Sequence, residues 1–111
     1  MNDLLKRLSE RKHTVIIGGS QPTVAELQRR LTKVGYVFVK FTETQGGTEL
    51  GIRVDQAATD LSHANFETQT GSLHLEGTLT LDYVPVRCKA DIDLETLNGT
   101  GQLVLLQSTQ A

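Results

Sequence analysis

Apolar residues alternate with polar ones through two consecutive stretches near the end of the chain. In the first stretch they occupy odd-numbered positions, and in the second even-numbered positions: Leu73, Leu75, Leu79, Leu81 and Tyr83, then Val86, Cys88, Ala90, Ile92 and Leu94. A period of two places alternate side chains on one face, so each stretch predicts a half-buried strand. Opposed residues of an antiparallel pair share a face. The change from odd to even therefore predicts a two- or four-residue turn near residues 83–86, where Pro85 fits.

The dipeptide Asn98-Gly99 predicts a second hairpin turn, because this pair readily adopts the positive φ angles of a tight turn. Centring the turn there places Leu94 opposite Leu103, so that apolar residues face one another across the hairpin. The last forty residues are thus expected to form an antiparallel β-meander.

Two helices are predicted in the front part of the chain. Thr23 and Glu26 have the spacing of a capping box, apolar residues follow at helical intervals, and Gly35 stands where a helix ends in the left-handed region. A narrower apolar stripe predicts another helix over residues 2–12. A β-branched run predicts a short strand over residues 14–17.

The middle of the chain predicts two more strands and a less regular segment. Residues 36–42 are largely apolar on both faces, which is typical of a central strand. A turn at residues 45–48 leads into an alternating strand over residues 49–55. A short helix is expected at residues 57–61, followed by a loop. The predicted fold is a single α+β domain over residues 1–111, with two N-terminal helices packed on a mainly antiparallel sheet that ends in a β-meander.

Composition predicts a cytoplasmic protein with no membrane partner. No apolar run approaches the roughly 20 residues that cross a bilayer. Residues 1–13 are charged throughout and lack the apolar stretch of a secretory signal. The lone cysteine, Cys88, cannot form an internal disulfide, which favours a reducing compartment.

Charge is divided unevenly along the chain although the net charge is only −2. Residues 1–40 hold eight Lys and Arg against three Asp and Glu, a net of +5. The remaining residues hold three against ten, a net of −7. Such asymmetry steers and orients charged partners.

The last strand carries a candidate protein interface. Val104 and Leu106 lie on the face that also carries Asp91 and Asp93, so two apolar side chains are expected on an otherwise solvated surface. An apolar patch on an exposed strand is covered either by a helix or by another chain. The pattern predicts contact with a second copy of this chain or with another protein.

A second candidate site would bind phosphate or nucleic acid. Exposed amides and glycines before a helix attract anions, and basic side chains on the helix would add to this field. The predicted residues are Gly18, Gly19, Ser20, Arg29, Arg30 and Lys33. Basic residues of the first helix would extend the patch: Lys6, Arg7, Arg11 and Lys12. The alternative interpretation is an ordinary glycine turn and two solvated helix faces.

Catalytic and metal-binding motifs are not found in the sequence. Cys88 is in phase with core residues, and the three histidines, His13, His63 and His74, share no ligand spacing. His74 and Glu76 point the same way on one predicted strand, opposite a strand that carries Asp91, Asp93 and Glu95. Alternating acids of this kind more often mark a solvated face than a calcium site. No metal, no cofactor and no catalytic residue is predicted.

These observations favour a non-enzymatic binding or assembly module that acts through protein–protein contacts and associates with itself. The alternative is a small protein that binds nucleic acid or phosphate through its basic N-terminal helices. A pocket for a small apolar ligand between sheet and helices is a third, weaker interpretation.

Overall fold

The computed structural model describes residues 3–19, 23–44, 46–81 and 83–106. The elements in chain order are α1 (Asp3–Glu10), β1 (His13–Ile17), α2 (Val24–Arg29), the π-helical turn η1 (Arg30–Val34), β2 (Tyr36–Phe41), β3 (Thr48–Val54), β4 (Ala64–Asn65), β5 (Thr70–Leu81), β6 (Val84–Asp93) and β7 (Asn98–Leu105).

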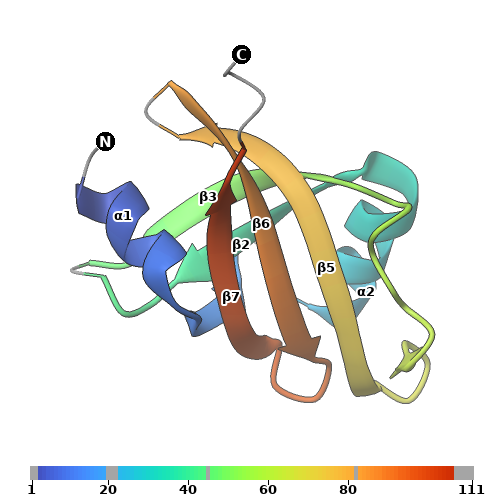
Figure 1. The fold of residues 1–111 in the computed structure, drawn as a ribbon. Coiled ribbons are helices and arrows are strands. Elements are labelled where there is room, and N and C mark those ends of the chain that lie inside the picture. Colours follow the sequence, from blue (N-terminus) through green and yellow to red (C-terminus); the bar gives the residue numbers. More distant parts are fainter. Residues whose placement is uncertain (1–2, 20–22, 45, 82, 107–111) are drawn as a thin grey trace.

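The strands form a six-stranded antiparallel barrel with one outer strand (Figure 1). Their order is β3-β2-β1-β7-β6-β5, and β3 pairs with β5 to close the sheet on itself. The short strand β4 pairs with the first two residues of β5, Thr70 and Gly71. The expected α+β composition and antiparallel sheet are therefore confirmed, whereas the sheet is closed into a barrel. Closure removes most of the free strand edges that an open sheet would expose.

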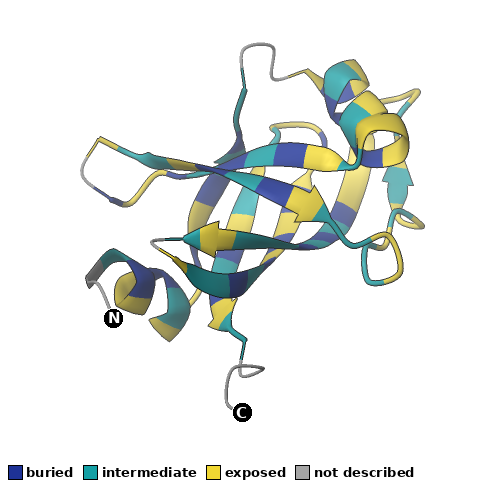
Figure 2. Cartoon of the chain, turned by 90° about the horizontal axis from the view of Figure 1, so that it is seen from above, coloured by how far each residue is buried: buried dark blue, intermediate teal, exposed yellow. Residues whose placement is uncertain are grey.

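The two helices lie on opposite sides of the barrel, as both views show (Figures 1 and 2). Leu5 and Leu8 of α1 are fully buried and belong to the same apolar core as the barrel interior. Among the described residues, no helix has both the length and the apolar character needed to span a lipid bilayer.

His13 ties α1 to the barrel. Its side chain is buried, Nε2 lies 2.7 Å from the carbonyl oxygen of Arg7, and Nδ1 lies 3.1 Å from Oε1 of Glu43. The other Glu43 oxygen accepts the Thr14 N–H at 2.8 Å, and this backbone hydrogen bond is the main reason that the pKa of Glu43 falls to about 2.

The predicted start and end of the α2 region are confirmed, whereas Glu26 does not complete the predicted capping box, because its carboxylate binds Arg29 and Arg30. Thr23 is the N-cap, and its hydroxyl oxygen accepts the Glu26 N–H at 3.2 Å. Gly35 ends the helical region with φ of 77°, and its N–H donates to the carbonyl of Arg30, five residues back. Glycine suits this position because it has no Cβ to strain the left-handed conformation.

The turn between β5 and β6 has the even length that the alternation predicts. Leu81 pairs with Val84, so two residues form the turn. Tyr83 lies in this turn and not in the strand; it has φ of 68° and is 95% exposed. Pro85 lies within β6, opposite Thr80.

The predicted register of the next hairpin is wrong. Cys88, and not Leu94, lies opposite Leu103, and the turn occupies residues 94–97. Gly99 lies inside β7, where a Cβ would clash with the carbonyl oxygen of Asp91. This glycine therefore permits a close approach of two strands, and it does not form a turn.

Residues 55–61 do not form the predicted helix. This segment, called the strap below, runs along the edge of β5. The Asp55 N–H donates to the Glu76 carbonyl at 2.8 Å, and Asp60 exchanges two backbone hydrogen bonds with His74. The strap thereby satisfies backbone groups that the edge of β5 would otherwise expose.

Candidate functional site

The barrel is closed by a short joint between β3 and β5. Only two residue pairs form it, Arg53 with Thr78 and Val54 with Gly77. In this register the next opposed residues would be Ile52 with Leu79 and then Gly51 with Thr80, but the two strands do not pair there. The unpaired stretch beyond Arg53 and Thr78 is called the seam below.

The backbone groups of Gly51 and Thr80 point into the seam. The Val54 N–H donates to the Gly35 carbonyl, on the side where β2 lies. The backbone N–H and C=O groups of successive residues point to opposite sides of an antiparallel strand. The backbone groups of odd-numbered residues of β3 therefore point away from β2. On β5, even-numbered residues point away from β6, because Glu76 and His74 bond to the strap. In the part of the chain that the structure describes, no strand pairs with the seam side of Gly51 or Thr80.

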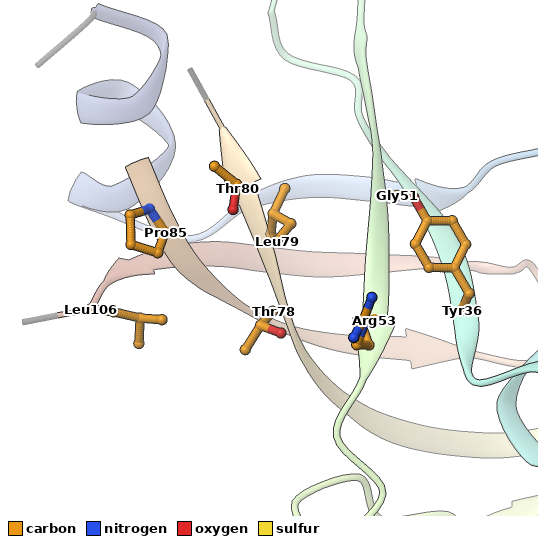
Figure 3. Close-up of a pocket in the computed structure, with 8 residues that line it drawn as sticks. All are labelled: Tyr36, Gly51, Arg53, Thr78, Leu79, Thr80, Pro85 and Leu106. Atoms are coloured by element: carbon orange, nitrogen blue, oxygen red, sulfur yellow. The ribbon is translucent and has the colours of Figure 1, made fainter. Parts of the chain in front are cut away.

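An open groove of about 550 Å³ lies at the seam (Figure 3). Residues from four strands and one residue just after β7 line it: Tyr36, Gly51, Arg53, Thr78, Leu79, Thr80, Pro85 and Leu106. Figure 3 shows Gly51 and Arg53 on one side, facing the residues of β5 on the other. A mixture of apolar side chains, one cation and free backbone groups suits a polypeptide ligand.

Two aromatic side chains lie on the outside of the barrel beside the groove. The Tyr36 ring lies over Gly51, where a Cβ would clash with the tyrosine hydroxyl. Tyr36 and Phe38 pack edge to face with ring centroids 5.5 Å apart, and the Arg30 guanidinium lies 5.3 Å from the Phe38 centroid. Tyr36 is 41% exposed. The apolar outer face of β2 is thus a surface feature and not a second core face.

Of the two predicted interface residues, Leu106 lies in the groove and Val104 lies outside it. Leu106 lines the groove, and its N–H reaches the carbonyl of Pro85 at 3.4 Å. Val104 is 37% exposed and lies opposite Arg87 on the same outer face, outside the groove lining. The predicted apolar positions are therefore on the surface, next to a cationic side chain.

The predicted glycine loop does not present free amides at the two positions that are described. The Gly18 N–H donates to the Phe38 carbonyl at 2.9 Å, and the Gly19 N–H donates to a Glu49 carboxylate oxygen at 3.3 Å. Ser20 lies outside the described residues. A carboxylate beside the loop opposes an incoming anion.

The basic side chains of α2 and η1 are largely engaged with one acid. Arg29 and Arg30 both bind Oε2 of Glu26, at 2.7 and 2.9 Å. The Arg29 hydrogen bond is the main cause that lowers the pKa of Glu26. Lys33 is exposed and forms no ion pair with a described residue. Because α1 and α2 lie on opposite sides of the barrel, the basic residues of the two helices do not form one patch.

A chain of charged side chains covers the outer face of β5 and β6. Arg87 bonds to Asp55 of the strap and, at 2.9 Å, to Glu76; Glu76 in turn lies 2.6 Å from His74. The other ring nitrogen of His74 lies 2.8 Å from Asp91. These groups satisfy one another, and the described residues include no cluster of three His, Cys, Asp or Glu side chains that would hold a metal ion.

Cys88 is a core thiol, as its phase in the sequence predicts. It is fully buried, and burial raises its pKa to about 12. A thiol in this environment is neither ionised nor accessible, so it is a poor nucleophile.

Sequence reasoning missed most of the groove. Arg53, Thr80 and Pro85 each lie on a predicted strand or turn, but their proximity depends on the contact between β3 and β5. The available local signal is the glycine at position 51 within an otherwise regular strand, since such glycines often mark a close approach of other groups.

The chain matches no protein-family model, and no curated protein is significantly similar to it in sequence.

Proposed function

We propose that this chain is a non-enzymatic binding and assembly module that acts through protein–protein contacts, self-association among them. The contact surface is the outer face around the seam. The observation that carries the proposal is the coincidence of the exposed Tyr36 and the half-buried Pro85 and Leu106 with two unpaired strand edges in one groove. Exposed apolar groups beside a free edge are typical of association surfaces.

Charge supports the same interpretation. The early strands and helices belong to the basic part of the sequence, whereas residues 41–111, which include β3 to β7, hold ten of the thirteen acids. Such a field orients an approaching partner and increases the rate of association. The buried thiol of Cys88 supports a reducing, cytoplasmic setting.

The test is the oligomeric state of the purified protein, measured by native mass spectrometry and sedimentation. We expect a defined oligomer, which Leu106→Lys converts to the monomer because a charge would be buried in the contact. Val104→Lys should weaken the oligomer in the same direction.

Thr100→Lys is the matched control, because it adds the same charge to an exposed, outward position on β7 away from the groove. This control should leave the oligomer unchanged. A monomeric wild type, or an oligomer insensitive to Leu106→Lys, would contradict self-association through this surface.

A second candidate function is single-stranded nucleic-acid binding. It is favoured by the outward Tyr36 and Phe38 with Arg30 stacked beside them, since aromatic rings and cations together bind bases and phosphates. Fluorescent oligothymidylate at low salt tests it. Arg29→Ala and Arg30→Ala should weaken binding and flatten its salt dependence. No detectable binding at low salt would exclude this candidate.

A further inference from the structure

We infer that the seam is a strand-addition site for an extended segment of a partner protein that alternates acidic and apolar residues. This inference rests on the proposed function, because it names the kind of partner that the groove accepts. The segment would lie between β3 and β5, with backbone bonds to Gly51 and Thr80 and an acidic side chain beside Arg53.

The backbone requires an occupant that both donates and accepts hydrogen bonds. Gly51 and Thr80 each direct one N–H and one C=O toward the seam, and no described strand pairs with them there. A polypeptide in extended conformation offers donors and acceptors at the same repeat. A phosphate backbone offers only acceptors, so it matches these edges less well.

The size of the groove suits a short stretch of strand. A rise of about 3.4 Å, a strand spacing of about 4.8 Å and a sheet separation of about 10 Å give roughly 160 Å³ per residue. The groove of about 550 Å³ therefore accommodates about three residues, with the flanking residues in solvent.

Side chains at the seam differ between its outer and inner sides. Arg53 points outward from β3, and no described carboxylate lies within ion-pair distance of it. Arg87, by contrast, is already bound by Asp55 and Glu76. Leu79 points inward from β5 and is only partly buried. An inserted strand would thus place acidic residues outward, beside Arg53, and apolar residues inward, against Leu79.

Gly51 makes the edge of β3 accessible. Its outward position carries no side chain, and the Tyr36 ring that lies over it belongs to an exposed, flexible side chain. Rotation of this ring would uncover the backbone, and the ring could then pack on an apolar residue of the incoming segment.

The experiment uses the full chain and a pool of fluorescent hexapeptides that alternate any apolar residue with Asp or Glu. One matched pool carries Lys or Arg at the acidic positions, and another carries N-methyl groups at alternate residues. We expect the acidic pool to bind, with amide NMR shifts at Gly51 and Thr80. The basic pool should bind about tenfold more weakly or less, and N-methylation should abolish binding because it removes the backbone donors.

Variants separate strand addition from general adhesion. Arg53→Glu should reverse the preference, so that the basic pool binds better than the acidic pool. Arg11→Glu is the matched control, because it makes the same change at an exposed arginine outside the groove. Thr80→Pro removes the amide that faces the seam while keeping the bonds between β5 and β6, and it should weaken binding of the acidic pool.

Three results would overturn the inference: no binding of the acidic pool, equal binding of the N-methylated pool, or amide shifts confined to another surface. The oligomer measurement is independent of these results. If Leu106→Lys dissociates an oligomer but the acidic pool does not bind, strand addition fails and the proposed function stands. If the acidic pool binds at the seam of a monomeric protein, self-association fails and strand addition stands.

Discussion

Gly51 of β3 and Thr80 of β5 lie opposite each other two residues beyond Arg53 and Thr78, the last strand pair that closes the barrel, yet they do not pair. The other joints of the barrel have more residue pairs, from three between β1 and β2 to ten between β5 and β6. The joint between β3 and β5 therefore has the fewest residue pairs of the joints that close the barrel. A joint with few backbone bonds opens more readily than its neighbours.

Gly77 permits the two strand pairs that do form, and Gly77→Ala should destabilise the protein. A Cβ at this position would clash with the Arg53 carbonyl oxygen and with the side chain of Ile52. We expect a loss of about 2 kcal/mol in the free energy of unfolding, measured by urea denaturation. Gly51→Ala is the control, because the atoms nearest to its Cβ would be the hydroxyl and ring carbons of the exposed Tyr36 side chain, whereas at Gly77 the nearest is a backbone oxygen. Equal stability of the two variants would contradict this account of barrel closure.

Replacing Tyr83 by asparagine should make the protein more stable. It lies in the β5–β6 turn with φ of 68°, and its side chain is almost fully exposed. A left-handed backbone strains a residue with a bulky Cβ, and asparagine tolerates this region better. Tyr83→Asn should raise the free energy of unfolding by about 0.5 kcal/mol. An unchanged or lower urea midpoint would mean that Tyr83 makes a stabilising contact in solution.

Local patterns predicted the elements whose determinants lie close together in sequence. The N-cap at Thr23 and the helix end at Gly35 are present because each depends on hydrogen bonds within a few residues. The change of the apolar positions from odd-numbered in β5 to even-numbered in β6 also predicted the even length of the turn between them.

Features that depend on contacts between residues far apart in the sequence could not be predicted from local patterns. Gly99 resembles a turn residue, but its role is a close approach to Asp91 on the neighbouring strand. Barrel closure joins Arg53 to Thr78, and nothing in either strand alone specifies that pairing. The groove depends on this closure. The sequence therefore predicted Leu106 as an interface residue without predicting Arg53 or Thr80 beside it.

Cys88 should resist thiol reagents in the folded protein. Its side chain is fully buried, and its pKa of about 12 keeps it protonated at neutral pH. We expect very slow reaction with a disulfide reagent under native conditions and rapid, complete reaction in urea, followed by absorbance. Fast stoichiometric labelling of the folded protein would show that the thiol is accessible, and would restore it as a candidate nucleophile.

His74 should make stability fall as the solution becomes mildly alkaline. Hydrogen bonds to Glu76 and then to Asp91 raise the His74 pKa above its ordinary value of 6.5, and Asp60 of the strap also faces the ring.

The protonated His74 ring is the form that the two carboxylates stabilise. Its contribution to the free energy of unfolding is therefore complete below pH 6.5 and is lost as pH rises through the raised pKa. The Glu76 pKa is lowered, chiefly by His74, so the contribution of that carboxylate is present above pH 4.5 and is lost as pH falls through the lowered pKa. His74→Gln should therefore remove the decline in the free energy of unfolding above pH 6.5, measured by urea denaturation at steps of about one pH unit. His63→Gln should retain the decline, because this exposed histidine has no hydrogen-bonded carboxylate in the described structure. If wild type and His74→Gln decline in parallel, the paired imidazolium does not contribute to folding.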